Sequence, residues 1–207
     1  MPTNMFRGFE NAGKEEGLIF VVLGNDDPGI ITWVPNVLIK AKETGLALLD
    51  DNSLVDLNES EIPPNKKLLE PITNEMLQKF DNYEINEIEN FICRFKNQQN
   101  HEIDLKNGIK LIQIIGNNFS NKNYNYLINH NTGFNLSILK AKKGLIEDLI
   151  FDKPTILFSQ KGNWRVKIGK DEFNINSKDT FSLPLNTKLS ISIDNNEDCF
   201  LNCVSKA

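Results

Sequence analysis

The alternation of apolar and polar residues divides the chain into a short apolar run, a helical region and a long region of brief alternating segments. The apolar run, Leu18 to Leu23, consists partly of β-branched residues. It ends in the turn-forming sequence of residues 24–29, which contains Pro and Gly. This pattern predicts a buried strand followed by a loop.

Short helices are expected after this loop. Pro35 favours the first position of a helix that ends near Gly45, because proline is pre-organised for a helix start and glycine for the turn at its end. Residues 50–71 are polar and interrupted by two prolines, so we predict a linker there. Thr73 and Asn86 are the expected N-caps of two further helices, since apolar residues follow each at helical spacing.

From about residue 103 the pattern becomes one of short strands separated by turns. Trp164, Val166 and Ile168 alternate with cationic residues, and Leu189, Ile191 and Ile193 alternate with serines. The expected strands are residues 110–115, 134–139, 155–159, 164–168, 172–175, 180–183, 189–193 and 199–204. Several short strands of period two at close spacing predict an antiparallel sandwich or barrel.

Composition narrows the classes of protein that fit. The 207 residues carry 23 basic and 28 acidic side chains, a net charge of −5, which argues against nucleic-acid and anionic-membrane partners. We find no apolar segment long enough to span a bilayer and no secretory leader after Met1, so a cytoplasmic location is expected. Cys93, Cys199 and Cys203 are too few and too unevenly spaced for a disulfide framework or a zinc site, and the last two are expected in the core.

Histidine is scarce, which limits metal chemistry. The chain has 2 histidines, His101 and His130, so a site built on several imidazoles cannot be assembled within one chain. Both are best interpreted as residues of polar turns. The acidic turn at residues 26–29 lacks the spaced oxygen ligands that Ca²⁺ requires and is also interpreted as a turn.

Residues 162–169 and 173–184 resemble the latter half of a cupin barrel, in which a glycine closes the first motif and a proline opens the second. In this alignment Lys178 and Asn186 stand at two glycine positions of the second motif. Asn186 is a mild replacement, because Asn tolerates left-handed backbone. Leu189 stands where the family has a histidine ligand, and this replacement removes a metal ligand.

The resemblance also places the remaining metal-ligand positions of the family. They fall at Leu149, Phe151 and Thr155, or one residue earlier at Asp148 and Ile150 for the two histidine positions. Neither register supplies an imidazole, and apolar side chains cannot hold a divalent ion. We therefore expect no metal and no cofactor.

Residues 2–11 resemble a second copy of the closing motif, with Arg7 at the histidine position, and the run from Leu18 follows it as a last strand would. The chain thus resembles a bicupin that begins within its first barrel. The expected domains are residues 1–29 as the tail of a first barrel, 30–102 as a helical linker and 103–207 as a cupin barrel. The predicted fold class is mainly β, with a C-terminal double-stranded β-helix, the cupin jelly roll.

An apolar pocket is the expected site. Its candidate lining residues are Phe151, Phe158, Trp164, Leu189 and Arg7. Such a lining suits either a filled core or a small apolar or aromatic ligand. Arg7 could contact an anion, although a surface arginine is the favoured interpretation. A partly uncovered strand at residues 18–23 would favour self-association, so a homo-oligomer is expected.

Three functions stay open, and with them the question of whether the chain is an enzyme. The favoured one is a degenerate, metal-free bicupin-type protein that binds a small molecule or is structural. The second is a fragment of an iron-dependent cupin dioxygenase of the aromatic-ring-cleaving or quercetinase type, which Arg7 at a ligand position weakens. The third is a metal-independent cupin isomerase.

Overall fold

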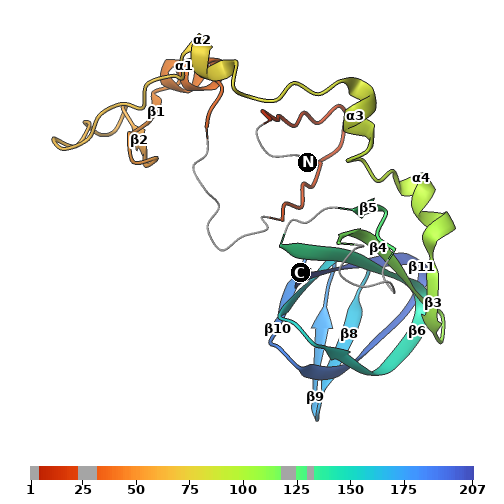
Figure 1. Ribbon diagram of the computed structural model, residues 1–207. Coiled ribbons are helices and arrows are strands. Elements are labelled where there is room, and N and C mark those ends of the chain that lie inside the picture. Colours follow the sequence, from red (N-terminus) through yellow and green to blue (C-terminus); the bar gives the residue numbers. More distant parts are fainter. Residues whose placement is uncertain (1–4, 23–31, 118–124, 130–132) are drawn as a thin grey trace. The chain divides into compact units, whose positions relative to one another are not determined.

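The computed structural model describes residues 5–22, 32–117, 125–129 and 133–207 (Figure 1). The chain forms two units, Met1–Ile19 with Pro28–Ile85 and Phe20–Asp27 with Asn86–Ala207. The turns predicted at residues 24–29 and around His130 lie outside the described residues. Within the described residues, no helix is long and apolar enough to cross a membrane.

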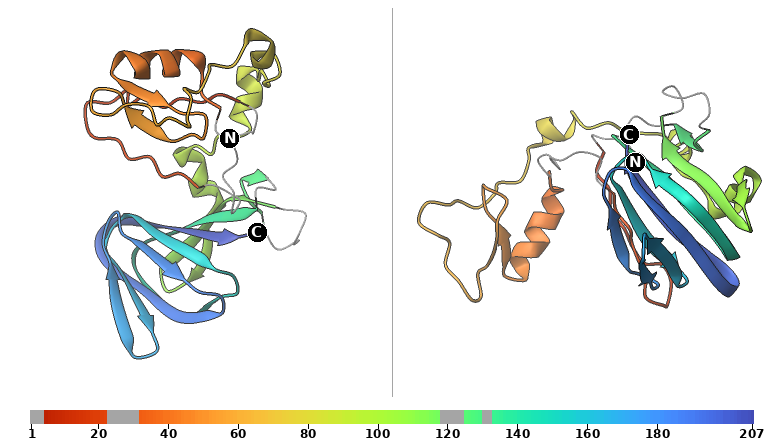
Figure 2. Two further views of the ribbon diagram at one scale, coloured as in Figure 1. Left: turned by 90° about the vertical axis from the view of Figure 1, so that its left-hand side faces the viewer. Right: turned by 90° about the horizontal axis from the view of Figure 1, so that it is seen from below.

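The first unit is a helix beside a small β-hairpin (Figure 2). It contains α1 (Pro35–Glu43), β1 (Leu46–Leu48), β2 (Leu54–Asp56) and α2 (Asn74–Leu77). Pro35 opens α1 as predicted, and Gly45 has φ +86° just beyond its end. Thr73 caps α2, since its hydroxyl accepts a hydrogen bond from the Met76 N–H at 3.3 Å.

The prediction that residues 50–71 form a linker is wrong. β2 pairs with β1, and an isolated bridge joins Leu49 to Leu68. The hairpin buries a small core around Ala47, Leu49 and Val55. Strands of three residues are too short to show an alternating pattern, so they cannot be recognised in a segment that is polar overall.

Three short helical segments precede the strands of the second unit. They are α3 (Ile85–Glu89), α4 (Phe95–Gln98) and the single 3₁₀ turn η1 (Gln99–His101). Asn86 is not an N-cap as predicted, because α3 begins one residue earlier. Its side-chain oxygen accepts a hydrogen bond from the adjacent Glu87 N–H instead.

Nine strands then build the body of the second unit. They are β3 (Ile103–Lys106), β4 (Ile109–Gly116), β5 (Ile128–Asn129), β6 (Phe134–Phe151), β7 (Thr155–Lys161), β8 (Trp164–Ile168), β9 (Asp171–Ile175), β10 (Thr180–Leu183) and β11 (Thr187–Lys206). The eight segments predicted from alternation all lie within these strands. β6 and β11 are longer than predicted, at 18 and 20 residues.

The strand pairing is that of a jelly roll, because β6 and β11 each contribute to two sheets (Figure 2). Residues 134–141 of β6 pair with 199–206 of β11, and β7, β10 and β4 extend this first sheet. Residues 143–151 of β6 pair with 187–194 of β11, and β8 and β9 complete the second. The first sheet thus contains these five strands and the second contains four, and antiparallel sheets linked in this order form the double-stranded β-helix. The predicted fold class is confirmed.

The core of the jelly roll lies between the two sheets. Alternation along β8 buries Trp164 and Val166 and exposes Arg165 and Lys167, as predicted. The buried cluster comprises Ile109, Leu139, Ala141, Leu157, Trp164, Val166, Ile175, Leu183, Leu189, Ile191, Ile193, Cys199, Leu201 and Cys203. Burial of this much apolar surface is the main favourable term for the unit.

Two turns support the alignment with the cupin motif. Lys178 has φ +76° and Asn186 has φ +59°, and these are the residues aligned with glycines of the second motif. Gly162, which closes the first motif, has φ +94°. The backbone therefore keeps the left-handed conformations that glycine favours, even where the side chain has changed.

The outer face of the first sheet is also apolar and is covered by two segments that precede the strands. Phe20 stacks on Phe158 with ring centroids 4.5 Å apart and an angle of 7° between the planes. Phe95 of α4 meets Phe200 edge-on at 5.6 Å. The strand predicted over Leu18–Leu23 is wrong for the described residues 18–22, which are paired with no described strand and contact the sheet through Phe20.

Candidate functional site

The interior of the jelly roll is the first place to seek a site. Leu189 on β11 lies directly opposite Leu149 on β6, and Phe151 lies opposite Thr187. Leu189 and Thr155 are each 2% exposed, and the Thr155 hydroxyl donates to the Lys153 carbonyl at 3.0 Å. The strand pairing thus brings Leu149, Phe151 and Leu189 together, and these side chains offer no donor to a transition metal. Thr155 lies on β7, where it pairs with Ser205 and Leu183.

Three of the five predicted pocket residues pack in this interior. Trp164 and Leu189 belong to the buried core, and Phe151 packs against it. The Trp164 indole N–H donates to the Lys161 carbonyl at 3.4 Å, so its polar atom has a partner. These three side chains help to fill the space between the sheets.

The other two predicted pocket residues lie elsewhere. Phe158 is buried, but alternation along β7 places it on the outer face of the first sheet, where it contacts Phe20. Arg7 is exposed and belongs to the first unit, whereas the other four belong to the second. His101 lies in η1 and is exposed.

The buried polar groups of the core have structural partners. The Ser159 hydroxyl donates to the Gly162 carbonyl at 2.7 Å. Cys199 and Cys203 are buried, as predicted, and desolvation raises the pKa of the Cys203 thiol to about 12. A thiol with so high a pKa is inert as a nucleophile near neutral pH. The described residues contain no group of three or more His, Cys, Asp or Glu arranged to hold a metal ion.

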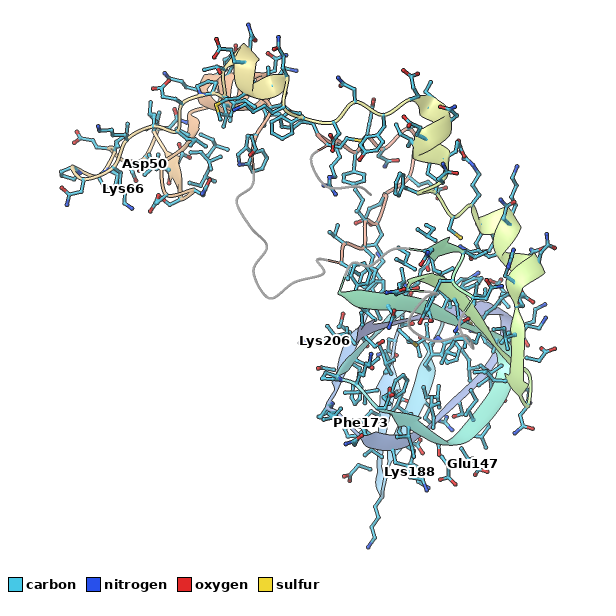
Figure 3. All side chains as sticks on the ribbon, in the orientation of Figure 1. Asp50, Lys66, Glu147, Phe173, Lys188 and Lys206 are labelled. Atoms are coloured by element: carbon cyan, nitrogen blue, oxygen red, sulfur yellow. The ribbon has the colours of Figure 1, made fainter. Side chains whose placement is uncertain are left out.

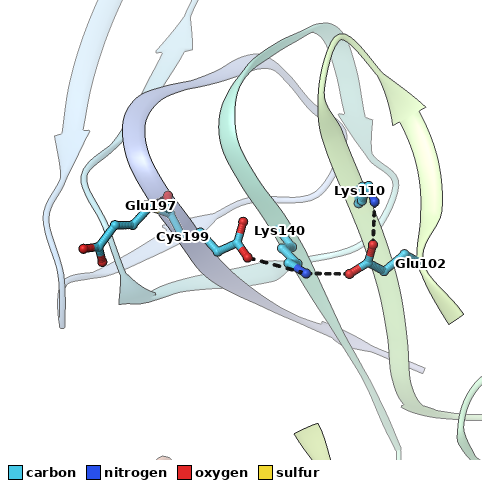
Figure 4. Close-up of polar contacts among 6 residues, drawn as sticks. Glu102, Lys110, Lys140, Glu197 and Cys199 are labelled. Atoms are coloured by element: carbon cyan, nitrogen blue, oxygen red, sulfur yellow. Dashed lines mark hydrogen bonds and ion pairs between the residues drawn. The ribbon is translucent and has the colours of Figure 1, made fainter. Parts of the chain in front are cut away.

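An ion-pair network lies across β4, β6 and β11 (Figure 4). Glu102 accepts from Lys110 and from Lys140, each at 2.6 Å, and Lys140 also lies 3.7 Å from Asp198. The Glu102 and Lys140 side chains are 11% and 13% exposed. The hydrogen bonds from Lys110 and Lys140 lower the pKa of Glu102, and the same contact raises the pKa of Lys110. The network ties the segment before β3 to the jelly roll.

Replacing Glu102 by Gln is expected to lower the free energy of unfolding at pH 7 by about 1–2 kcal/mol, because two charge-assisted hydrogen bonds are weakened. The pKa of Glu102 is lower in the folded state, so the stabilisation is present above the unfolded-state pKa and is lost as the pH falls through the folded-state value. Urea unfolding at pH 7 and at acid pH measures both effects. Between pH 7 and acid pH, the free energy of unfolding is expected to fall less for Glu102→Gln than for the unmodified chain. Equal falls for the two proteins would show that the network is not stabilising.

Glu172→Gln is the matched control for that experiment. Glu172 pairs with Arg165 at 3.1 Å, but both side chains are more than half exposed. Exposed ion pairs contribute little, so the control is expected to unfold within about 0.5 kcal/mol of the unmodified chain.

The outer face of the second sheet carries two adjoining polar hollows of about 550 and 660 Å³. Arg165 lines both, and its partner Glu172 lines the first. Lys188 lines the first as well and pairs with Asp148 at 2.9 Å (Figure 3). Because the charges neutralise one another and are well exposed, the face presents no single charge to a ligand.

A different hollow lies at the outer face of the first sheet. It is a groove of about 740 Å³ whose lining is mostly apolar. Its lining residues are Phe20, Val21, Val22, Gly133, Phe134, Pro154, Thr155, Ile156, Thr180, Ser182, Val204, Ser205 and Lys206. We call it the Phe20 groove. The sequence contained the signal for one wall, the apolar run from Leu18, but that run was assigned to a buried strand.

No protein-family model matches this chain, and no curated protein is significantly similar to it. Solved structures match about half of the chain. A RmlC-like cupin from Shewanella frigidimarina is 9% identical, with a TM-score of 0.42 over 56% of this chain and 88% of that chain. The putative ethanolamine utilization protein EutQ of Salmonella typhimurium is 9% identical, with a TM-score of 0.38 over 55% of this chain and 76% of that chain. A cupin-like protein from Thermotoga maritima is 11% identical, with a TM-score of 0.40 over 49% and 70%.

At these identities the likeness concerns the fold alone. The order of strands in the two sheets already defines a jelly roll, the architecture that cupins share with other all-β proteins. The strand pairing of the second unit is therefore the jelly roll that the resemblance around Gly162 predicts.

Proposed function

We propose that this cupin-fold protein is a metal-free binding or structural component whose ligand is a small apolar or aromatic molecule. The observation that carries the proposal is the chemistry at the aligned ligand positions. Leu149, Phe151 and Leu189 present hydrocarbon, and the Thr155 hydroxyl is engaged by the backbone. Transition metals need imidazole, thiolate or carboxylate to replace their hydration shell.

The packing of the interior supports the same proposal. Trp164, Leu157 and Ile191 are each 0% exposed, so they close the space between the sheets. A ligand of ordinary size would have to displace well-packed side chains, which is costly. Binding is therefore expected on the outer faces of the sheets. No observation among the described residues favours the dioxygenase or the isomerase alternative.

The proposal extends to location and partners. It retains the cytoplasmic location, which rests on cysteine content and composition, and the exclusion of nucleic acid, which rests on the net charge of −5. It also retains a homo-oligomer, because Leu18, Ile19 and Val21 are each more than half exposed.

The purified protein is expected to contain well under one equivalent of any transition metal per chain, and chelator is expected to leave its thermal midpoint unchanged. Elemental analysis and thermal unfolding with and without chelator measure the two quantities. Addition of iron, manganese, nickel or zinc to the chelated protein is the control. Near-stoichiometric metal that is lost together with stability would overturn the proposal.

A further inference from the structure

We propose that the Phe20 groove is a binding site for an amphipathic carboxylate, a molecule with an aliphatic body and one terminal carboxylate group. This inference rests on the proposed small-molecule function and names its site and ligand class. It is carried by three observations on the second unit: an apolar floor and wall, exposed apolar side chains, and a single positive charge among the described lining residues.

The floor of the groove belongs to the first sheet. Ile156 on β7 lies opposite Val204 on β11, and Phe134 on β6 lies opposite Lys206 on the same strand β11. The strand pairing holds these positions, so the floor exists before any ligand arrives. A preformed apolar surface of this kind loses little conformational freedom on binding.

The wall of the groove is the segment Phe20 to Val22. It makes no strand pairing with a described residue, and the stacking of Phe20 on Phe158 at 4.5 Å joins it to the sheet. Near-parallel aromatic contacts of this kind contribute stabilisation beyond that of the apolar area that they bury. Phe20 therefore positions the wall and presents the rest of its ring to the groove.

Apolar side chains remain exposed along this groove. Ile156 is 43% exposed, Val21 is 62% exposed and Phe20 is 37% exposed. Contiguous exposed apolar surface is unfavourable in water and typically marks a binding site. The groove volume of about 740 Å³ lies within the ordinary range for small-molecule sites, about 300–1,000 Å³.

The charge of the groove selects the class of ligand. Among the described residues that line the groove, Lys206 is the one that carries a charge (Figure 3). Hydroxyl groups of Thr180, Ser182 and Ser205 also line it. One ammonium group with nearby hydroxyl donors complements a carboxylate, whereas a cationic head group would meet like charge.

The test compares three 12-carbon probes that differ in their head group: dodecanoate, dodecanol and dodecyltrimethylammonium. Isothermal titration calorimetry below the critical micelle concentrations measures their affinities for the full chain. Dodecanoate is expected to bind about two- to fivefold more tightly than dodecanol, as an exposed ion pair allows. The cationic probe is expected to bind more weakly than either.

Two variants locate the site. Lys206→Gln is expected to reduce dodecanoate affinity to that of dodecanol and to leave dodecanol unaffected. Phe20→Ala is expected to weaken both by about fivefold or more, since the wall loses its anchor. Lys170→Gln, in an exposed turn, and Phe9→Ala, an exposed phenylalanine of the first unit, are the matched controls.

Each outcome decides a separate part of the inference. Equal binding of dodecanoate and the cationic probe, or no effect of Lys206→Gln, would overturn the carboxylate class. Unchanged affinity in Phe20→Ala would overturn the groove as the site. Failure of all three probes to bind would overturn the inference, while the metal content of the same preparation would still decide the metal-free function.

Discussion

Trp164→Ala is expected to lower the free energy of unfolding by about 3–5 kcal/mol, the cost typical of removing a large buried aromatic side chain. Trp164 on β8 is 0% exposed and belongs to the same buried cluster as Val166 and Ile191. The indole fills the space between the two sheets, so its removal leaves a cavity that the paired strands cannot close. Chemical denaturation followed by circular dichroism measures the change.

Phe173→Ala is the control for this prediction. Phe173 is an aromatic residue on the neighbouring strand β9, but it is 40% exposed and contacts Phe181 at 5.4 Å. Its truncation is expected to cost about 1 kcal/mol or less. If the two variants unfolded at the same denaturant concentration, the interior would not be the packed core described above.

Gly162→Ala is expected to cost about 2–5 kcal/mol, because backbone strain and overpacking add. Gly162 has φ +94°, a conformation that L-residues adopt at a cost. A methyl group there would also meet the Cys199 side chain, whose Cβ would lie 2.6 Å away, and Cys199 is completely buried. Neither the turn nor the core can shift easily to make room.

Gly169→Ala separates the two contributions. Gly169 also has a positive φ, +60°, but a methyl group there would meet nothing within 4 Å. It should therefore show the strain alone, about 1–2 kcal/mol. Equal midpoints for the two alanine variants in urea would show that the contact with Cys199 has no energetic consequence.

The strands of the jelly roll could be predicted from the sequence because each buries one face. Trp164 and Val166 in β8, and Leu189 and Ile191 in β11, repeat at period two, and this pattern can be recognised without knowledge of the partner strand. The positive φ at Asn186 was also foreseeable, since asparagine tolerates that conformation. Local chemistry was sufficient in both cases.

Other elements depend on distant partners and could not be predicted. The run from Leu18 has the composition of a strand, but a strand requires a neighbour, and residues 18–22 find no described one. The continuity of β11 across Asp194 to Cys199 was equally hidden. There the pairing with β6 skips four residues of β11 against one of β6, a bulge that splits the apolar pattern into two apparent strands.

Part of the candidate site could also be predicted from the sequence, and part could not. The apolar character of Leu149, Phe151 and Leu189 was visible once the motif was aligned, and the strand register brings these positions together. The Phe20 groove was not predictable, because Phe20, Ile156 and Val204 come from three distant parts of the chain. Phe158 was correctly identified as a buried apolar residue. It lies on the outer face of the sheet against Phe20, and this face depends on its position along β7.

The position of β11 also has a consequence for how the chain folds during synthesis. Without β11, the jelly roll consists of three separate groups: β4 with β3, β5 and β6, then β7 with β10, and β8 with β9. β11 joins them all, since it pairs with β6, β7 and β8. Residues 187–206 leave the ribosome after the other strands of the jelly roll, so each earlier group keeps an apolar face exposed to water until β11 is available. Such non-local strand pairing is intrinsically slow, and the apolar surface exposed until it is complete is of the kind that chaperones bind.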